Sequence, residues 1–346
     1  MNKFVNKILK DNKILLNKVK KKKMTVATDC SGIETPIYAL RQLKIPYSHI
    51  FSSDIDKSCQ KFIKENHNPN EFYEDLRKRN NNKYKNKSID IYVAGFPCQT
   101  FSSLGSYEGF ENKEKGKIFF HIYDFLVKNQ PKVFILENVR TLVTHDKGKT
   151  FKIIMKMLKK LKNYDIEYKI LNTNNYNIPQ SRNRIYIVGI KKSVKKRKFV
   201  FPDNLDLKNN IDDILTKQTK KEKLLPRHKI LYSEITKKYK DINSKNKWIL
   251  NLNVSTIDWF RRGQTNMCPC LVTYCNYYIT HHKRYLTPNE ALLFQGILPK
   301  DLKKFKNFNN NQICKFAGNC MSINVLISLF CKSFYENVCN FCQWDD

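Results

Sequence analysis

Three side chains with complementary chemistry stand near the ends of three strand-like segments of this 346-residue chain. Cys98 follows the turn at residues 95–97, Glu137 follows four apolar residues, and Arg184 closes a Gln-Ser-Arg-Asn-Arg run. A cysteine thiolate is a nucleophile. A carboxyl group whose pKa is raised by desolvation can act as a general acid, and a guanidinium stabilises developing negative charge. Together they predict covalent nucleophilic catalysis.

The reaction that uses all three groups is methyl transfer to carbon 5 of cytosine, which is a poor nucleophile by itself. Addition of the Cys98 thiolate to ring carbon 6 gives an enamine whose carbon 5 can attack an electrophilic methyl group. Glu137 would share a proton with ring nitrogen 3, and Arg184 or Arg182 would stabilise the base carbonyl. The alternatives are a structural thiol, a helix-start glutamate and a phosphate-binding arginine.

Strand-like and helix-like segments alternate over residues 24–190 and must position these groups. This alternation predicts an α/β fold, with a mostly parallel, Rossmann-like sheet covered by helices on both faces. Ligands bind such sheets at the carboxyl ends of the strands, so Asp54, Cys98 and Glu137 are expected to line one crevice. The expected strands are residues 25–27, 49–53, 89–94, 133–136 and 185–190, and the expected helices are residues 34–42, 57–66 and 150–161.

A second group of residues predicts a nucleotide-like ligand beside that crevice. Residues 28–33 form a strand-to-helix turn in which Gly32 lets the backbone approach a ligand. Asp54 follows the next strand, where an acidic residue binds ribose hydroxyls in related folds. Asp75 is either an acceptor for an adenine amino group or a plain loop carboxylate.

Charge and composition indicate the kind of partner. The net charge of +33 points to a polyanion, most simply nucleic acid, although frequent Lys and Asn also suit an AT-rich genome and solvated faces. Hydrophobic residues make up 41% of the chain, which is enough to bury a core. Residues 1–23 predict a basic amphipathic helix that either contacts nucleic acid or caps a domain.

Cysteine usage and hydropathy favour an intracellular protein. The 11 cysteines are irregularly spaced and no signal peptide is recognised, so reduced thiols are expected. The Cys339/Cys342 and Cys268/Cys270 pairs lack a second pair at ligand spacing, so no metal is expected. We expect no apolar run long enough to span a bilayer.

The motifs and their order resemble those of the DNA cytosine-5 methyltransferases, in particular the compact bacterial restriction-modification enzymes. The resemblance runs over residues 24–335. Five motifs support this resemblance. They are the nucleophile loop (residues 95–102), the acid motif (137–139), the arginine motif (180–184), the helix after the target-recognition region (284–296) and the last motif (318–326).

The resemblance implies S-adenosylmethionine as methyl donor and a flipped cytosine of double-stranded DNA as acceptor. It makes Cys98 the nucleophile, places Glu137 on the base edge and Arg184 on the base carbonyl, and gives Arg182 a supporting role. The positions assigned to donor contacts are Cys30, Gly32, Ile33, Asp54, Ile55, Asp75, Leu76, Pro97, Asn319 and Cys320, and those assigned to DNA contacts are Gln99, Ser102, Arg261 and Arg262.

The resemblance also implies the domain organisation. A basic N-terminal helix (residues 1–23) precedes the catalytic methyltransferase domain (24–190), and a smaller target-recognition domain (191–304) follows, rich in Lys and Asn. A C-terminal segment (305–346) returns to the catalytic domain. We expect a monomer that acts where DNA is, in a prokaryotic cytoplasm, a nucleus or a viral replication site.

The donor loop departs from the family pattern. Cys30 stands where the family usually has Phe, Glu34 and Thr35 stand where further glycines are common, and Cys320 replaces the usual Ser. These changes suggest weaker adenine stacking and leave a DNA-binding homologue with weak catalysis as one alternative. The other is an RNA (tRNA) cytosine-5 methyltransferase, although the Cys-Phe-Thr motif of that branch is absent. The recognised DNA sequence is not readable from one chain.

Overall fold

The computed structural model describes residues 23–85, 87–97, 117–205, 210–217, 221–243 and 245–336. The predicted N-terminal helix, apart from Lys23, and the predicted site residues Cys98, Gln99 and Ser102 lie outside these ranges. The described chain divides into two compact units. The sheet unit contains residues up to 171, 183–203 and from 325 onward, and the second unit contains residues 172–182 and 204–324. The domain boundaries read from the sequence stay a prediction.

The sheet unit is built on a seven-stranded sheet in the order β3-β2-β1-β4-β5-β7-β6. Neighbouring strands from β3 through β5 pair in parallel, and β7 runs antiparallel to β5. The mostly parallel sheet is therefore confirmed. The strands are β1 (Met24–Asp29), β2 (Tyr47–Ser53), β3 (Glu71–Tyr73), β4 (Ile91–Gly95), β5 (Val133–Val139), β6 (Tyr164–Asn172) and β7 (Asn183–Lys191).

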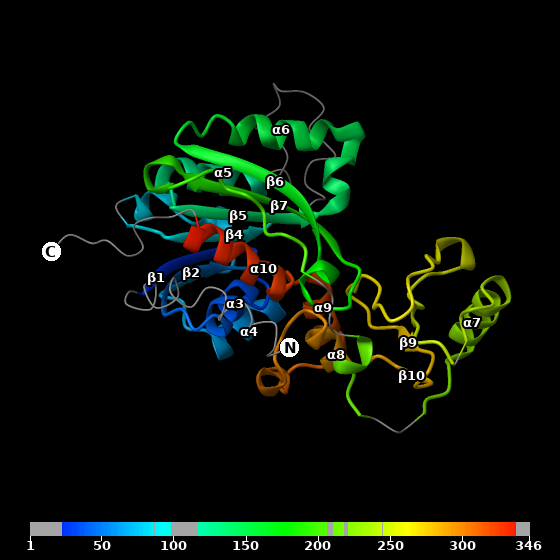
Figure 1. Ribbon diagram of the computed structural model, residues 1–346. Helices are drawn as coiled ribbons and strands as arrows, with labels where there is room; N and C mark the ends of the chain where they lie inside the picture. The colour runs from blue at the N-terminus through cyan, green and yellow to red at the C-terminus, as the bar shows by residue number, and fades with distance from the viewer. Residues whose placement is uncertain are drawn as a thin grey trace. The chain divides into compact units, whose positions relative to one another are not determined.

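Helices cover both faces of this sheet, with α5 and α6 on one face and α3, α4 and α10 on the other (Figure 1). Burial on both faces explains why β4 and the first four residues of β5 are continuous apolar runs and do not alternate. Phe119 and Phe125 of α5 pack in one core cluster with Tyr92 and Phe134 of the sheet. The helices are α3 (Thr35–Gln42), α4 (Lys57–Asn66), α5 (Lys117–Asn129), α6 (Lys149–Leu158) and α10 (Ile323–Phe330).

The predicted strands and helices of this unit are confirmed within a few residues, but three elements were missed. Strand β3 has only 3 residues, β6 is an edge strand with exposed residues at its centre, and α5 is rich in aromatic residues that also suit a strand. One placement was wrong: Glu137 lies inside β5, not past its end. The strand continues to Val139 because β7 pairs along its whole length.

The second unit contains a small antiparallel sheet in the order β10-β9-β8 and the helix α7 (Pro226–Lys238). Its own core gathers Leu231, Ile235, Trp248, Phe260 and Tyr278. Thr287 caps the helix that follows it, because its hydroxyl accepts from the Glu290 amide at 3.2 Å. The remaining elements are β8 (Ile249–Asn251), β9 (Tyr277–Ile279), β10 (Arg284–Tyr285), α8 (Pro288–Leu293) and α9 (Asn310–Asn319).

Two sequence expectations on cysteines and hydropathy need correction. Cys275 and Cys314 form a disulfide with their Cα atoms 5.6 Å apart, so the expectation of reduced thiols is wrong for this pair. The two residues are 39 positions apart, and only folding brings them together. The helical stretch Asn310–Phe334 is long and apolar enough to cross a membrane, but 89% of its apolar window is buried inside the protein, as in a core helix.

Candidate active site

The predicted acid and arginine lie on neighbouring strands. Glu137 of β5 is opposite Tyr186, and Arg184 of β7 is opposite Val139, so both side chains belong to one end of this strand pair. Arg184 Nε lies 3.2 Å from Glu137 Oε1, and Glu137 is only 7% exposed. A guanidinium at this distance fixes the orientation of the carboxylate. The structure therefore joins two residues that the sequence places 47 positions apart.

The neighbouring strand β4 brings the chain toward Cys98. Gly95 is the register partner of Glu137 in the parallel β4–β5 pair, and Pro97 is exposed two residues later. Asn138 donates from Nδ2 to the carbonyl oxygen of Phe96 at 2.7 Å. This buried bond fixes the last residues of the chain before Cys98 against the acid strand. Asn138 lies within the acid motif at residues 137–139, and its sequence position alone indicated no role for it.

The Arg182 side chain is buried, and its guanidinium donates to backbone carbonyls. Its side chain is 1% exposed and lies within the second unit. Its Nη1 donates to the carbonyl of Leu271 at 3.0 Å, and its Nη2 donates to the carbonyls of Gly318 and Cys320 at 2.9 and 2.8 Å. A buried guanidinium bonded to three backbone carbonyls holds loops together. The supporting role expected for Arg182 in the reaction stays a prediction.

The predicted donor loop crosses from β1 to α3 and is fastened to the end of β2. The Ser31 amide donates to the Ser53 carbonyl at 2.9 Å, and the Gly32 amide donates to Asp54 Oδ2 at 2.7 Å. Gly32 has φ +57°, which favours glycine, and an added Cβ would meet nothing within 4 Å. Burial raises the pKa of Asp54 to about 6. The loop thus presents open space beside a half-buried carboxyl group.

The other predicted donor contacts near this loop lie in different environments. Ile55 is 67% exposed immediately after Asp54 and offers an apolar surface, whereas Ile33 and Leu76 are buried in the core. Burial raises the pKa of the Cys30 thiol, so this side chain is a neutral apolar group. Asp75 accepts from Arg77 Nε at 3.0 Å and from Nη2 at 2.7 Å, which occupies both of its carboxylate oxygens.

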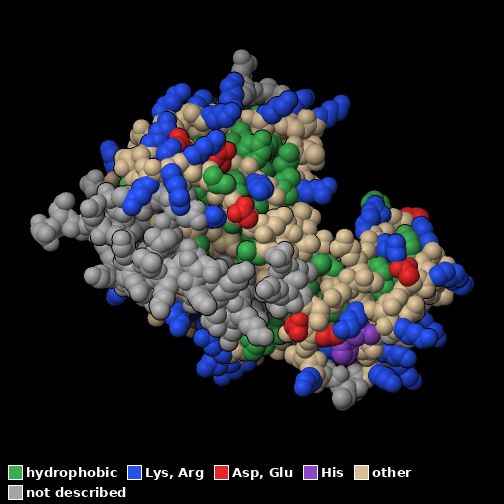
Figure 2. All heavy atoms as spheres, viewed as in Figure 1, with side chains coloured by type: hydrophobic (Ala, Val, Ile, Leu, Met, Phe, Trp, Pro, Cys, Tyr) green, Lys and Arg blue, Asp and Glu red, His purple; other side chains and the backbone are tan. Residues whose placement is uncertain are grey.

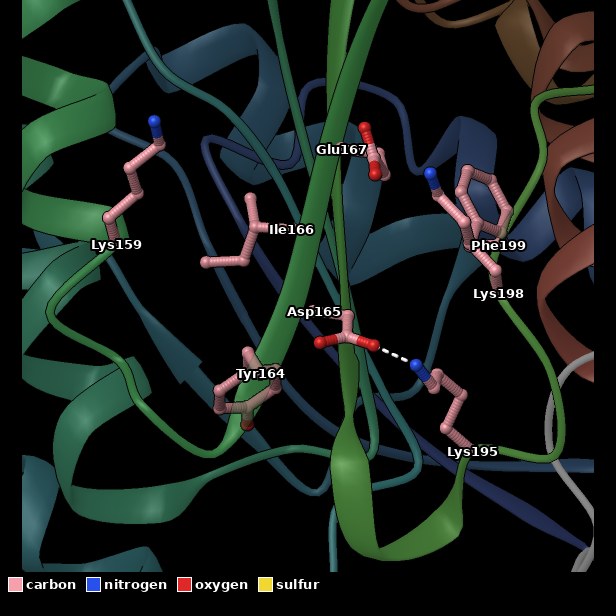
Figure 3. A pocket seen from close by; sticks show the side chains of 8 residues that line it. All are labelled: Lys159, Tyr164, Asp165, Ile166, Glu167, Lys195, Lys198 and Phe199. Carbon is pink, nitrogen blue, oxygen red and sulfur yellow. Dashed lines mark hydrogen bonds and ion pairs between the residues drawn. The ribbon is translucent and has the colours of Figure 1, made fainter.

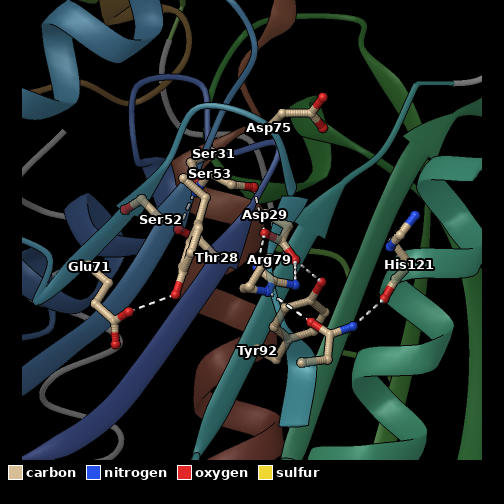
Figure 4. A network of polar contacts seen from close by, with 12 residues as sticks. Thr28, Asp29, Ser31, Ser52, Ser53, Glu71, Asp75, Arg79, Tyr92 and His121 are labelled. Atoms are coloured by element: carbon tan, nitrogen blue, oxygen red, sulfur yellow. Dashed lines mark hydrogen bonds and ion pairs between the residues drawn. The ribbon is translucent and has the colours of Figure 1, made fainter. Parts of the chain in front are cut away.

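A buried ion pair lies beneath this loop, and sequence analysis did not find it. Asp29 at the end of β1 accepts from Arg79 Nη1 at 2.5 Å and Nη2 at 2.7 Å, and also from Tyr92 and Ser53 (Figure 4). The guanidinium carbon of Arg79 lies 4.2 Å from the ring centroid of Phe51. The pair ties β1, β2 and β4 together where the donor loop begins. An acidic residue ending a buried strand was the only sequence signal.

The remaining predicted contacts lie in the second unit. Asn319 is the exposed last residue of α9, and Cys320 is buried beside it. Arg262 forms an ion pair with Asp241 and stacks 5.5 Å from the Trp248 ring centroid, so its side chain has a structural partner. Arg261 is exposed and donates to the carbonyl of Asp258 at 2.7 Å. Their predicted roles toward donor and DNA stay predictions.

Among the described residues, one group could hold a metal ion: Asp212, His281 and His282. Asp212 Oδ1 lies 2.8 Å from His281 Nε2, and Lys247 Nζ lies 2.6 Å from Asp212 Oδ2. A metal at Nε2 of His281 would leave the ring proton on Nδ1, which is buried with no hydrogen-bond partner among the described residues. The group is better explained as an ion-pair cluster, and the prediction of no metal stays a prediction.

A pocket of mixed charge lies along the edge strand β6, and no residue assigned to the site from the sequence lines it. Lys195 forms an ion pair with Asp165 across it, as Figure 3 shows. The lining residues are Lys159, Tyr164, Asp165, Ile166, Glu167, Lys195, Lys198 and Phe199. The candidate active site is therefore the strand ends around Asp54 and Glu137, not this pocket.

Comparison with known proteins gives matches over most of the chain. The family model described as C-5 cytosine-specific DNA methylase matches residues 24–334. Type II methyltransferase M.NgoBI of Neisseria gonorrhoeae is 35% identical over 249 residues, which cover 68% of this chain and 71% of that protein. Type II methyltransferase M.HaeII of Haemophilus aegyptius is 36% identical over 246 residues, with the same two coverages, 68% and 71%.

Solved structures share the fold at lower sequence identity. The Dnmt2 methyltransferase of S. pombe has a TM-score of 0.65 at 17% identity and covers 89% of this chain and 97% of that one. A mutant of the DNMT2 protein of Spodoptera frugiperda has a TM-score of 0.67 at 16% identity, covering 90% and 100%. The fold is that of S-adenosylmethionine-dependent methyltransferases.

Proposed function

The chain belongs to the C-5 cytosine-specific DNA methylase family, and we propose that it methylates carbon 5 of a cytosine flipped out of double-stranded DNA. S-adenosylmethionine is the proposed donor, and Cys98 is the proposed nucleophile. One observation of the structure supports this most directly. The Glu137–Arg184 ion pair lies on β5 and β7, and Gly95, the register partner of Glu137, ends the strand that leads to Cys98.

The proposed chemistry divides the reaction into two covalent steps. The Cys98 sulfur forms a bond to ring carbon 6, and the electron pair of the 5,6 double bond becomes available at carbon 5. Glu137 stabilises the charge that reaches ring nitrogen 3 by sharing a proton there. Carbon 5 takes the methyl group, which leaves S-adenosylhomocysteine as the second product. Carbon 5 then gives its proton to solvent, and the electron pair of that carbon–hydrogen bond restores the 5,6 double bond as the sulfur–carbon bond breaks and the thiolate leaves. Arg184 holds Glu137 in orientation and is proposed to stabilise the charge on the base carbonyl.

The donor loop fits a nucleoside-containing donor. Bound S-adenosylmethionine would supply an electrophilic methyl group on a sulfonium sulfur. Asp54 is proposed to accept from its ribose hydroxyls, and the exposed Ile55 is proposed to pack against its adenine ring. The space above Gly32 leaves room for the ligand. Asp75 is already bonded to Arg77, so an adenine contact there would require that pair to open.

Transfer of labelled methyl from S-adenosylmethionine tests this proposal. Unmethylated genomic DNA is the substrate, and tRNA is assayed in parallel. Label recovered as 5-methylcytosine in DNA supports the proposal. Label found only in tRNA contradicts the DNA substrate and favours the RNA alternative, and folded protein without transfer to either substrate favours the weakly catalytic DNA-binding homologue.

Glu137→Gln is expected to lower the single-turnover methylation rate by about 10²–10⁴-fold, because an amide cannot share a proton with ring nitrogen 3. DNA affinity is expected to change little, since glutamine keeps the size of the side chain. Quenched-flow assays at saturating DNA and donor measure the rate. Glu167→Gln on β6 is the matched control and is expected to keep the wild-type rate. An unchanged rate in Glu137→Gln would contradict the acid role.

DNA binding is expected to weaken steeply with salt, because lysines and arginines that neutralise phosphates release counterions. Lys and Arg side chains are spread over the face seen in Figure 2, and the chain has 64 of them against 31 acidic residues. If 6–10 phosphates are contacted, affinity should fall by about 10³–10⁵-fold between about 50 and 200 mM salt. Fluorescence anisotropy with a labelled duplex measures this. A flat affinity would contradict a basic DNA-binding surface.

A further inference from the structure

Glu34 occupies an unusual position at the junction of the donor loop and helix α3. It is the N-cap of α3 and has φ 60° and ψ 48°, the left-handed conformation that glycine adopts most easily. Its side chain is nonetheless fully buried, with 0% exposure. In the sequence, Glu34 stands out only as a departure from a glycine-rich loop. A strained backbone carrying a buried acidic side chain requires a compensating interaction.

The compensation comes from hydroxyl groups on both flanking strands. Glu34 Oε1 accepts from Thr28 Oγ1 at 2.7 Å and from Ser52 Oγ at 2.5 Å. Thr28 is on β1 and Ser52 is on β2, so a single carboxylate oxygen links the two strands that flank the loop. His49 Nε2 lies 3.0 Å from Ser52 Oγ and 3.5 Å from Glu34 Oε1. Burial lowers the pKa of His49 to about 4, so the imidazole is neutral there.

The network continues into the donor loop itself. The Thr28 hydroxyl lies 2.8 Å from the Ser31 hydroxyl, whose oxygen accepts from the Ser53 amide at 3.1 Å. The next residue, Gly32, donates its amide to Asp54. Thr28, Ser31, Ser52 and Ser53 lie together at these strand ends in Figure 4. Glu34 is therefore connected, through two hydroxyl groups, to the segment that sets the distance between Gly32 and Asp54.

We propose that Glu34 is a positioning residue for the methyl donor: its carboxyl group holds the loop of residues 30–33 against the end of β2, in place of the glycines that shape such loops elsewhere. The inference rests on the proposed donor, S-adenosylmethionine. Two substitutions separate the effect of the carboxyl group from the effect of the left-handed backbone at this position. Glycine would relieve the left-handed backbone but remove the acceptor, whereas glutamine would keep an acceptor oxygen and the strained backbone.

Glutamine is the conservative substitution for Glu34, because the raised pKa of Glu34 favours its neutral form. Burial raises its pKa to about 7, against the hydroxyl donors Ser52, Thr28 and Ser31 and the more distant charge of Arg41, which all lower it. Near neutral pH a large share of the molecules therefore carries a neutral carboxyl group. Glutamine is neutral and similar in shape, and its carbonyl oxygen can accept from Thr28 and Ser52.

The test compares donor affinity in Glu34→Gly, Glu34→Gln and a matched backbone control. Lys44 follows the other end of α3, is exposed, and has φ 56°. Lys44→Gly therefore relieves the same backbone strain without touching the network. Calorimetry without DNA measures the affinity of the full chain for S-adenosylmethionine and for its demethylated product, S-adenosylhomocysteine. Thermal melting without ligand and DNA affinity are measured on each variant.

Glu34→Gly is expected to lose about 10–100-fold in affinity for both ligands, because the hydrogen bonds from Thr28 and Ser52 to the carboxyl group are lost. Glu34→Gln and Lys44→Gly are expected to stay within about threefold of wild type, and DNA affinity is expected to be unchanged in all three. A Glu34→Gly variant that binds both ligands as well as wild type would overturn the proposal. So would a lowered melting temperature with unchanged donor affinity, which is the signature of a purely structural role.

Two further outcomes are distinguishable from these. If Glu34→Gly does not fold, Ser52→Ala removes one donor to the same carboxylate oxygen and is judged by the same affinity criterion. If folded wild-type protein binds neither ligand, the proposed donor is wrong, and the inference falls with it. Wild-type binding together with full binding by Glu34→Gly rejects the inference alone and leaves the proposed function intact.

Discussion

Cys98→Ala is expected to abolish methylation while leaving DNA and donor binding close to wild type. Alanine has no lone pair to add to ring carbon 6, so carbon 5 stays unreactive, and the rate should fall by about 10⁴-fold or more, as in other enzymes that lose their nucleophile. Cys98 supplies a bond and little affinity. The measurement is single-turnover methyl transfer to duplex DNA at saturating donor, with binding followed by anisotropy.

A trapping experiment separates the nucleophile from a structural thiol. With 5-fluorocytosine in the target site, carbon 5 has no proton to lose after methylation, so the sulfur–carbon bond cannot break. Wild-type protein should then form a denaturant-stable complex with DNA, and Cys98→Ala should not. Cys59→Ala, on helix α4, is the control and should behave as wild type. Turnover or a stable complex in Cys98→Ala would contradict the assignment.

Breaking the buried Asp29–Arg79 pair is expected to lower the free energy of unfolding by about 3–5 kcal/mol, because one charge would remain buried without its partner. Both side chains are 0% exposed, and Asp29 also accepts from Tyr92 and Ser53. Arg79→Met therefore leaves a carboxylate with too few donors, and Asp29→Asn leaves a guanidinium facing an amide. Urea denaturation followed by circular dichroism measures the change in each variant.

The double variant and an exposed pair provide the comparison. Asp29→Asn combined with Arg79→Met should cost much less than the sum of the single changes, since each removes the other's unpaired charge. Lys57 and Glu74 form an ion pair at 3.0 Å with side chains 79% and 54% exposed, so Lys57→Ala should change stability by only about 0–1 kcal/mol. A loss below about 1 kcal/mol in both buried single variants would contradict the stabilising role of the network.

The sheet could be predicted where periodicity and burial agree. Strand β4 and the first four residues of β5 are continuous apolar runs because both of their faces are covered, and such runs are visible in the sequence. Strand β6 was missed because it lies at the sheet edge, where it forms no continuous apolar run, and its exposed central residues 168–170 include both apolar and charged side chains. The end of β5 was misplaced because Glu137 is polar, and its strand conformation depends on pairing with β7, a strand distant in sequence.

The candidate site shows the same division. The sequence identified Glu137, Arg184, Gly32 and Asp54 because their residue types and order match a reaction and a family. It did not identify Arg79 or Glu34, whose partners lie on other strands. Nor did it find the Cys275–Cys314 disulfide, which joins a loop to helix α9.

The sequence by itself determined the class of protein: an α/β methyltransferase of the cytosine-5 family, with its acid and arginine in the family order. Motif order and apolar periodicity are properties of the chain alone, and they need no knowledge of distant contacts. Only the tertiary structure decided which groups are partnered. It pairs Arg184 with Glu137, Asp75 with Arg77, Asp29 with Arg79, and Glu34 with two strand hydroxyls. The energy of a buried polar group depends on what surrounds it after folding, and linear order does not encode those surroundings locally.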